Sequence, residues 1–170
     1  MNASTPASLL SPELIAMMDK GVSVNVSSCS LELRPSIMRA VGSAITAGCQ
    51  TVTVYVSRPQ SRQLIQDIAT TGLIAVVFSE PATHRTVQLK ASGARIRCAE
   101  PSDEAALARY LASMEQEVGR VGYGPAFTQA MLAHRLEDVV AISFEPQQAF
   151  DQTPGPRAGT ALNPRPASAA

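Results

Sequence analysis

The sequence predicts a mainly β protein, an antiparallel barrel with a few helices outside it. Most of the predicted elements are strands whose neighbours are joined by short turns, as in antiparallel sheets. Polar and apolar side chains also alternate along residues 85–90, so Thr86, Gln88 and Lys90 share one face of a strand and apolar residues share the other. Such a polar row faces either solvent or a polar ligand.

The first half of the chain begins with a helix. Ser11-Pro12-Glu13 combines an N-cap residue, a proline at the first helical position and an acid in the first turn, and Gly21 is a typical helix end. Alternating residues then predict strands, two of which form a hairpin that turns at 47–50. In order, we expect a helix over 11–21, strands over 22–27, 37–46 and 51–56, and a helix over 57–71 that ends before Gly72.

In the second half, residues 73–78 are continuously apolar, which is typical of a strand covered on both faces. The polar row belongs to a long strand that we expect to kink at Gly93. Ser102-Asp103-Glu104 is a helix start. The predicted elements are strands over 73–78 and 84–98, helices over 102–118 and 125–135, and a strand over 139–144.

The chain of 170 residues is long enough for one domain with a substantial core. We expect a flexible N-terminus over 1–10, the domain over 11–150, and a tail over 151–170 that is rich in proline, glycine and alanine and poorly ordered beyond Arg157. We expect no signal peptide, because no basic segment followed by a long apolar run opens the chain, and no stretch approaches the roughly 20 apolar residues that a membrane helix needs.

The cysteines and the charges narrow the function classes. Cys29, Cys49 and Cys98 are widely spaced, which favours buried thiols in a reducing, cytoplasmic protein over a disulfide framework or a metal site. The formal net charge is zero, but residues 34–97 hold eight basic and only two acidic side chains. Their arginines suit a phosphate or carboxylate, or else ion pairs with the acidic C-terminal helices. Overall neutrality and only two lysines argue against nucleic acid.

Three segments resemble a known family. They are Met38-Arg39-Ala40-Val41, the strand-to-helix turn over 55–63, and Phe78 with the later Arg85-Thr86-Val87-Gln88. Their order over residues 10–150 resembles the FMN-binding split β-barrel of the pyridoxamine 5′-phosphate oxidase-like superfamily. The resemblance implies a homodimer that holds FMN in a cleft between its subunits and acts on a small molecule.

The resemblance also implies which side chains contact FMN. Serines and arginines at a helix start suit its phosphate, and polar strand residues suit the pyrimidine edge of the flavin. The expected contacts are Arg39, Val41, Tyr55, Ser57, Arg58, Ser61, Arg62, Arg85, Thr86 and Gln88. Other interpretations stay open, because Arg39 and Arg62 also suit surface ion pairs, Ser57 and Ser61 suit helix capping, and Tyr55 suits the core. No catalytic residue and no metal ligand is identified.

The sequence departs from the family pattern at two phosphate-binding lysines. Gly42, Ser43 and Ala44 stand where the first is expected and Gln63 where the second is expected. Each charge-assisted contact contributes roughly 1.5–3 kcal/mol, so FMN would be held more weakly unless Arg58 substitutes. The C-terminal arginine- and histidine-bearing motif that grips pyridoxine phosphate is also absent, which argues against vitamin B6 oxidation.

An FMN-dependent small-molecule oxidoreductase is therefore the leading hypothesis. One alternative is a flavin- or haem-binding module without turnover, for which His84 and His134 are the available histidines. Another is a split barrel that has no cofactor and acts through protein interactions. Residues 150–156 combine an aromatic anchor with specific turn residues, and we expect them to fold back over the cleft or across the dimer.

Overall fold

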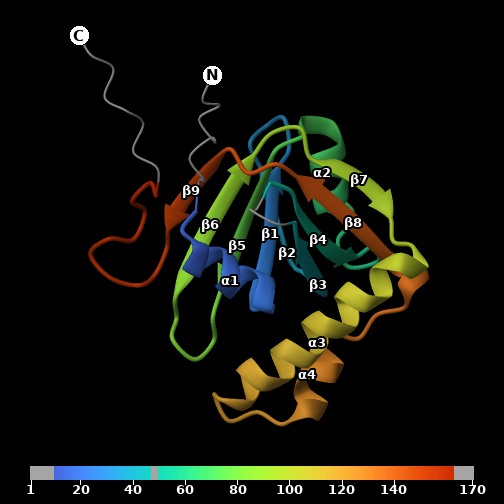
Figure 1. Ribbon diagram of the computed structural model, residues 1–170. Coiled ribbons are helices and arrows are strands. Elements are labelled where there is room, and N and C mark those ends of the chain that lie inside the picture. The colour runs from blue at the N-terminus through green and yellow to red at the C-terminus, as the bar shows by residue number, and fades with distance from the viewer. Residues whose placement is uncertain (1–9, 47–49, 163–170) are drawn as a thin grey trace, which may run out of the picture.

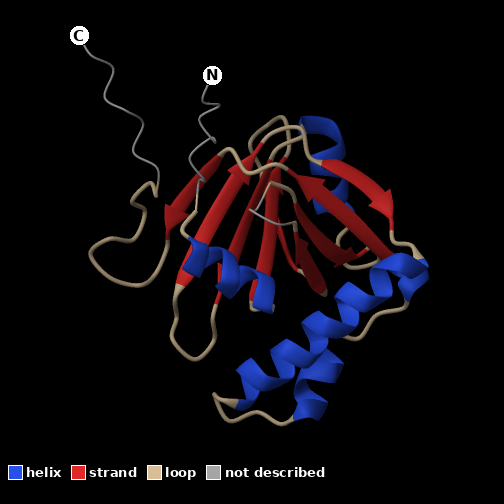
Figure 2. Cartoon of the chain, in the orientation of Figure 1, coloured by secondary structure: helices blue, strands red, loops and turns tan. Residues whose placement is uncertain are grey.

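The computed structural model describes residues 10–46 and 50–162. In that part of the chain, nine strands form two antiparallel sheets. Figures 1 and 2 show the strands gathered in the middle of the molecule and the helices at its periphery. The prediction of a mainly β, antiparallel architecture with outer helices is confirmed.

One sheet has five strands and the other has four. The five-stranded sheet runs in the order β2 (Pro35–Arg39), β1 (Ser23–Cys29), β5 (Ile74–Ser79), β6 (Thr86–Ala91), β9 (Gln148–Asp151). The four-stranded sheet runs in the order β3 (Gly42–Ile45), β4 (Val52–Ser57), β8 (Val139–Phe144), β7 (Arg95–Cys98). Fully buried side chains from both sheets, among them Val24, Val87, Val54 and Ile142, form the main hydrophobic core.

The chain crosses between the sheets where single long strands were predicted. The segment 37–46 is divided between β2 and β3, because the Ala40 amide donates to Val24 in one sheet and the Val41 amide donates to Tyr55 in the other. The segment 84–98 is divided between β6 and β7 around Gly93, whose φ of +76° favours glycine. These two crossovers join the sheets into a barrel.

The five-stranded sheet has a core face and an outer face. On β6, Val87 and Leu89 are fully buried while Thr86 and Gln88 are half-buried and Lys90 is exposed, so the predicted polar row is confirmed. The prediction that residues 73–78 are covered on both faces is wrong, because buried and half-buried side chains alternate along β5. The half-buried residues of β5 point to the outer face.

Within the described residues, four α-helices lie at the periphery of the barrel. They are α1 (Pro12–Lys20), α2 (Arg62–Thr71), α3 (Glu104–Gly119) and α4 (Pro125–Met131). Helix α1 is capped by Ser11 and ends at Gly21, as predicted. Helix α2 begins at Arg62 instead of Ser57, because Ser57 still pairs with Val139 in the sheet. Figure 1 shows α3 and α4 side by side, extending away from the barrel.

The C-terminal segment forms structure that the sequence did not predict. Strand β9 adds to β6, and the chain then returns so that Phe150 bridges to Ala161 and the Leu162 amide donates to Ala149 at 2.9 Å. The expectation of poor order beyond Arg157 is therefore wrong for residues 158–162. Residues 1–9 and 163–170, with the rest of the flexible-terminus predictions, lie outside the described residues.

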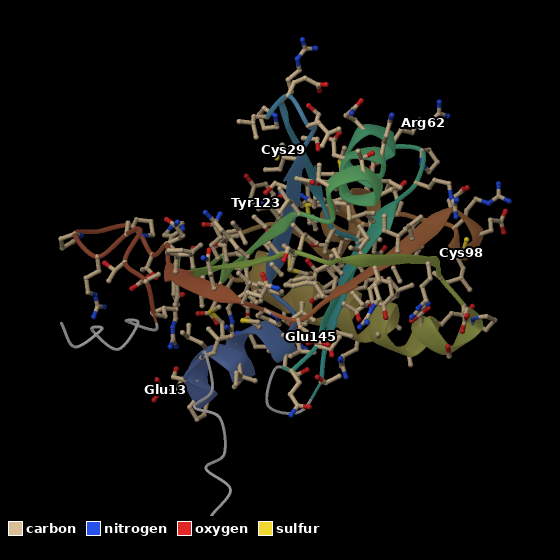
Figure 3. All side chains as sticks on the ribbon, turned by 90° about the horizontal axis from the view of Figure 1, so that it is seen from above. Glu13, Cys29, Arg62, Cys98, Tyr123 and Glu145 are labelled. Atoms are coloured by element: carbon tan, nitrogen blue, oxygen red, sulfur yellow. The ribbon has the colours of Figure 1, made fainter. Side chains whose placement is uncertain are left out.

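Two cysteines also differ from expectation. Cys29 is half-buried and Cys98 is exposed, and both are free thiols at separate places on β1 and β7 (Figure 3), whereas Cys49 lies outside the described part of the chain. None of the described helices has the length and apolar character needed to span a membrane.

Candidate functional site

The turn between β4 and α2 brings four of the predicted contacts together. Ser57 ends β4 and is buried, and its carbonyl accepts a hydrogen bond from the Gln60 amide. Arg58 is exposed, and its guanidinium donates to Cys98 Sγ at 3.2 Å. Arg62 is the first residue of α2, and Figure 3 shows its side chain on the outside of that helix. The turn therefore presents two arginines at a helix N-terminus, where unpaired amides favour an anion.

Ser61 has an unusual environment in this turn. It occupies the N-cap position of α2, but its φ of −115° and ψ of 23° differ from the extended backbone usual for a cap, and its hydroxyl makes no capping hydrogen bond. The side chain is only 2% exposed, and its Oγ has no hydrogen-bond partner among the described residues. The helix-capping interpretation of Ser61 is therefore wrong.

Val41 and Tyr55 lie in a separate place, beneath helix α3. Both are buried in a small apolar cluster with Leu107. A Cβ added at Gly42 would meet Leu107 Cδ2 at 2.7 Å, so the glycine makes room for α3. Because both side chains already pack beneath α3, we assign them to the core and not to a flavin contact.

A polar network fixes α3 on the four-stranded sheet. The Tyr55 hydroxyl donates to Asp103 Oδ1 at 2.8 Å, and Arg97 donates to both carboxylate oxygens at 2.6 and 2.8 Å. These Arg97 hydrogen bonds hold the pKa of Asp103 well below its usual range. Burial and the bond to Asp103 raise the pKa of Tyr55 to about 12. The network is structural, because each group is already paired.

The outer face of the five-stranded sheet holds Arg39 and Gln88 in one row. Strand register places Arg39 opposite Asn25, Asn25 opposite Val77 and Val77 opposite Gln88. Arg39 also donates to Ser23 Oγ at 2.9 Å, and within the described part of the chain it forms no ion pair with an acidic side chain. The predicted contacts therefore fall into separate groups within one chain: the β4–α2 turn, the buried pair under α3, and this outer face with the start of β6.

At the start of β6, Arg85 and Thr86 line a cavity that sequence reasoning did not assign. Its other lining residues come from α1 and from the C-terminal segment, namely Leu14, Asp151, Thr153, Arg157 and Leu162. The signal for it was the turn-rich segment over 150–156, which we expected to cover the cleft or cross the dimer; in the structure it pairs with β6 of its own chain. A second cavity lies at the opposite end of the outer face, beside Cys29, Lys90 and Gln148, and none of the predicted contacts lines it.

The histidines and acidic residues suggest no metal centre. His84 lies in a turn with a φ of +59°, and His134 Nδ1 is 2.8 Å from the Leu132 carbonyl. Within residues 10–46 and 50–162, no group of three or more His, Cys, Asp or Glu side chains is arranged to hold a metal ion.

No family model matches the sequence, and no curated protein matches it either. Solved structures do. A pyridoxamine 5′-phosphate oxidase-like protein of Lactobacillus delbrueckii is 10% identical, with 85% of this chain and 96% of that chain covered and a TM-score of 0.53. HupZ of group A Streptococcus is 14% identical, with 88% and 99% covered and a TM-score of 0.54. An F420 reductase is 12% identical, with 79% and 93% covered and a TM-score of 0.52.

The fold is that of the pyridoxamine 5′-phosphate oxidase-like split barrels. At these identities the likeness establishes the fold alone, so the fit of a cofactor to this split barrel depends on its own residues. The β4–α2 turn fits a phosphate, with an unpaired buried hydroxyl and two arginines. The amide of Gln63, which replaces an expected lysine, instead donates to Asp67 at 2.8 Å. The polar row of β6 fits the edge of a ring, but it lies on the other sheet.

Proposed function

We propose that this split barrel binds FMN as a homodimer and acts as an oxidoreductase on a small molecule other than pyridoxine phosphate. The observation that carries the proposal is Ser61 Oγ, a buried hydroxyl without a partner at the start of α2. A buried polar group without a hydrogen bond costs roughly 1–3 kcal/mol. A phosphate oxygen bound in this turn would accept that hydrogen bond and remove the cost.

Charge in the same turn favours a phosphate over a neutral group. Arg58 and Arg62 supply two cations, and the first amides of α2 supply donors. Arg58 is held toward β7 by its contact with Cys98, so it is positioned rather than free in solvent. These groups take the place of the two missing lysines in the proposal.

The second subunit enters the proposal because the ring-edge residues lie on the other sheet. Thr86 and Gln88 are on the outer face, whose edge strand carries Ile37 with 67% of its surface exposed. Leu31 and Leu33, in the adjoining turn, are 71% and 78% exposed. Exposed aliphatic side chains beside a half-buried sheet face are typical of an interface. We place a second copy there, with FMN between the β4–α2 turn of one copy and β6 of the other.

The chemistry of such a protein would come from the cofactor. A bound flavin supplies hydride and electron transfer, while the protein supplies binding, orientation and electrostatics. The phosphate turn would hold one end of FMN, and Thr86 and Gln88 would offer hydrogen bonds to its ring edge. The free thiols Cys29 and Cys98 support a cytoplasmic location as part of the proposal.

The test compares FMN with riboflavin, which lacks the phosphate. We expect the purified protein to bind FMN roughly 10- to 150-fold more tightly than riboflavin in a fluorescence titration, which corresponds to one charge-assisted contact of roughly 1.5–3 kcal/mol. Ser61→Ala and Arg62→Gln should remove most of that difference. Arg95→Gln, an exposed arginine of β7, is the matched control and should leave it unchanged.

Other outcomes separate the alternatives. Equal binding of FMN and riboflavin would refute the phosphate site. A Soret band in the purified protein would favour the haem-binding alternative, and no binding of either flavin would favour the cofactor-free interaction protein. Ile37→Asp should give a monomer in size-exclusion chromatography that no longer binds FMN; a dimer that still binds it would refute the shared site.

A further inference from the structure

The cavity at the start of β6 is built from groups of opposite charge. Its volume of about 440 Å³ lies within the range of roughly 300–1,000 Å³ found for small-molecule sites. Arg85 and Arg157 contribute cations, Asp151 contributes a carboxylate, and Leu14 and Leu162 contribute apolar surface. In Figure 3, Glu13 marks the end of α1 nearest to the C-terminal segment that closes this cavity.

The two arginines are not satisfied by their acidic neighbours. Arg85 Nη2 is 3.7 Å from Glu13 Oε2, and Arg157 Nε is 4.0 Å from Asp151 Oδ2. Both distances are too long for a hydrogen bond, and exposed pairs of this kind contribute little. Neither guanidinium donates a hydrogen bond to any other described residue, so both keep their donors available to a ligand.

Asp151 keeps one carboxylate oxygen available. Its Oδ1 accepts a hydrogen bond from the Thr153 amide at 2.9 Å, whereas Oδ2 has only the distant Arg157. The side chain is 18% exposed. The Thr153 hydrogen bonds lower the pKa of Asp151, and both arginines add to that effect, so the group is ionised at neutral pH. Oδ2 is therefore an anionic acceptor whose ion pair with Arg157 is too long for a hydrogen bond, beside two guanidinium groups that also lack hydrogen bonds to a carboxylate.

The C-terminal segment that carries Asp151 and Arg157 is held in place by contacts with β6 and by contacts within the segment. Lys90 Nζ lies 5.0 Å from the centre of the Phe150 ring, and Thr153 Oγ1 accepts a hydrogen bond from the Thr86 amide at 3.0 Å. The bridge from Phe150 to Ala161 closes the segment on itself. A site on such a fixed segment needs little reorganisation on binding.

We propose that this cavity binds a small zwitterion of the amino-acid type. Its carboxylate would lie between Arg85 and Arg157, its ammonium group would donate to Asp151 Oδ2, and its side chain would pack against Leu14 and Leu162. A simple organic anion leaves Asp151 facing a like charge, and a simple amine leaves two guanidinium groups facing a like charge. Only a ligand with both groups pairs all three side chains. The proposal does not depend on FMN.

The test uses leucine and two of its analogues in calorimetric titrations of the full chain. 4-Methylpentanoate lacks the amine and isopentylamine lacks the carboxylate. We expect leucine to bind and each analogue to bind roughly tenfold or more weakly, since each loses one charge-assisted contact. Arg157→Gln, at a side chain 85% exposed, should weaken leucine binding to a similar extent without affecting the fold.

Two further variants make the result specific. Asp151→Asn keeps an acceptor for the Thr153 amide, and it should abolish the preference for leucine over 4-methylpentanoate. Arg95→Gln removes a comparable exposed pair, 4.0 Å from Glu145, and should change nothing. Equal binding of leucine and 4-methylpentanoate to the unmodified protein would overturn the role of Asp151, and no binding of leucine would overturn the site. Both outcomes are independent of the flavin titration.

Discussion

Replacing Asp103 by asparagine tests how helix α3 is held on the barrel. The Asp103 carboxylate accepts four hydrogen bonds, from Tyr55, from two Arg97 nitrogens and from the Glu100 amide. An asparagine oxygen can keep about half of them, so about two charge-assisted bonds of roughly 1.5–3 kcal/mol each are lost. The side chain of Arg97 is 44% exposed, and solvent screening reduces the expected cost to about 2–4 kcal/mol.

Urea denaturation at neutral pH measures this cost directly, and thermal unfolding should show a decrease in Tm of about 5–15 °C for a chain of this size. Asp19→Asn is the control, because Asp19 is 53% exposed and lies 3.9 Å from Arg109. Its effect should stay below about 0.5 kcal/mol. A cost below about 1 kcal/mol for Asp103→Asn would refute the assignment of this network to the docking of α3.

The pH dependence of the same variant gives an independent check. Because Arg97 lowers the pKa of Asp103 in the folded state, its contribution to stability is complete above the unfolded pKa of about 3.9 and is lost as the pH falls toward the folded value. The difference in stability between the natural protein and Asp103→Asn should therefore be constant near neutrality and shrink in acid. A difference that is unchanged in acid would contradict the ion-pair explanation.

Two further predictions concern the same packed face. Gly42→Ala should lower the free energy of unfolding by about 1–2 kcal/mol, because the new Cβ would lie 2.7 Å from Leu107 Cδ2. This loss should be smaller in a Leu107→Ala background, and an equal loss in that background would contradict the steric explanation. The Tyr55 phenol should titrate at about pH 12, seen as the phenolate absorbance that Tyr55→Phe lacks, and lower in Asp103→Asn. Because the pKa of Tyr55 is raised on folding, its contribution to stability is present below about pH 10 and is lost as the pH rises through the folded value.

Local signals in the sequence predicted local structure well. Ser11, Pro12 and Gly21 mark the limits of α1, and the observed cap and turn follow those residue types because each satisfies a nearby backbone group. The alternation around Val87 likewise predicted which side chains of β6 are buried. Residues 37–46 misled because Ala40 and Val41 are adjacent apolar residues with no turn residue between them, and only the partner strands show that the chain changes sheets there.

The candidate site was predicted less completely. The β4–α2 turn was found, since serines and arginines at a helix start are visible in the sequence. The unpaired state of Ser61 Oγ was not, because it depends on which groups lie around a buried atom. Tyr55 has the same sequence context whether a flavin or helix α3 covers it, and the position of α3 decides in favour of the helix. Strand β9 was missed because four residues with a polar residue at each end carry little strand signal.

The sequence by itself determined the class of the fold, the limits of α1 and β8 and the polar row on β6, because these depend on the types and the periodicity of neighbouring residues. Tertiary structure alone decided where the chain crosses from one sheet to the other and that Asp103 holds α3 over Tyr55. It also decided that Asp151 and Arg157 line the same cavity as Arg85, although more than sixty residues of sequence separate them from it. Contacts between distant segments depend on packing and closure of the barrel, and no local pattern encodes them.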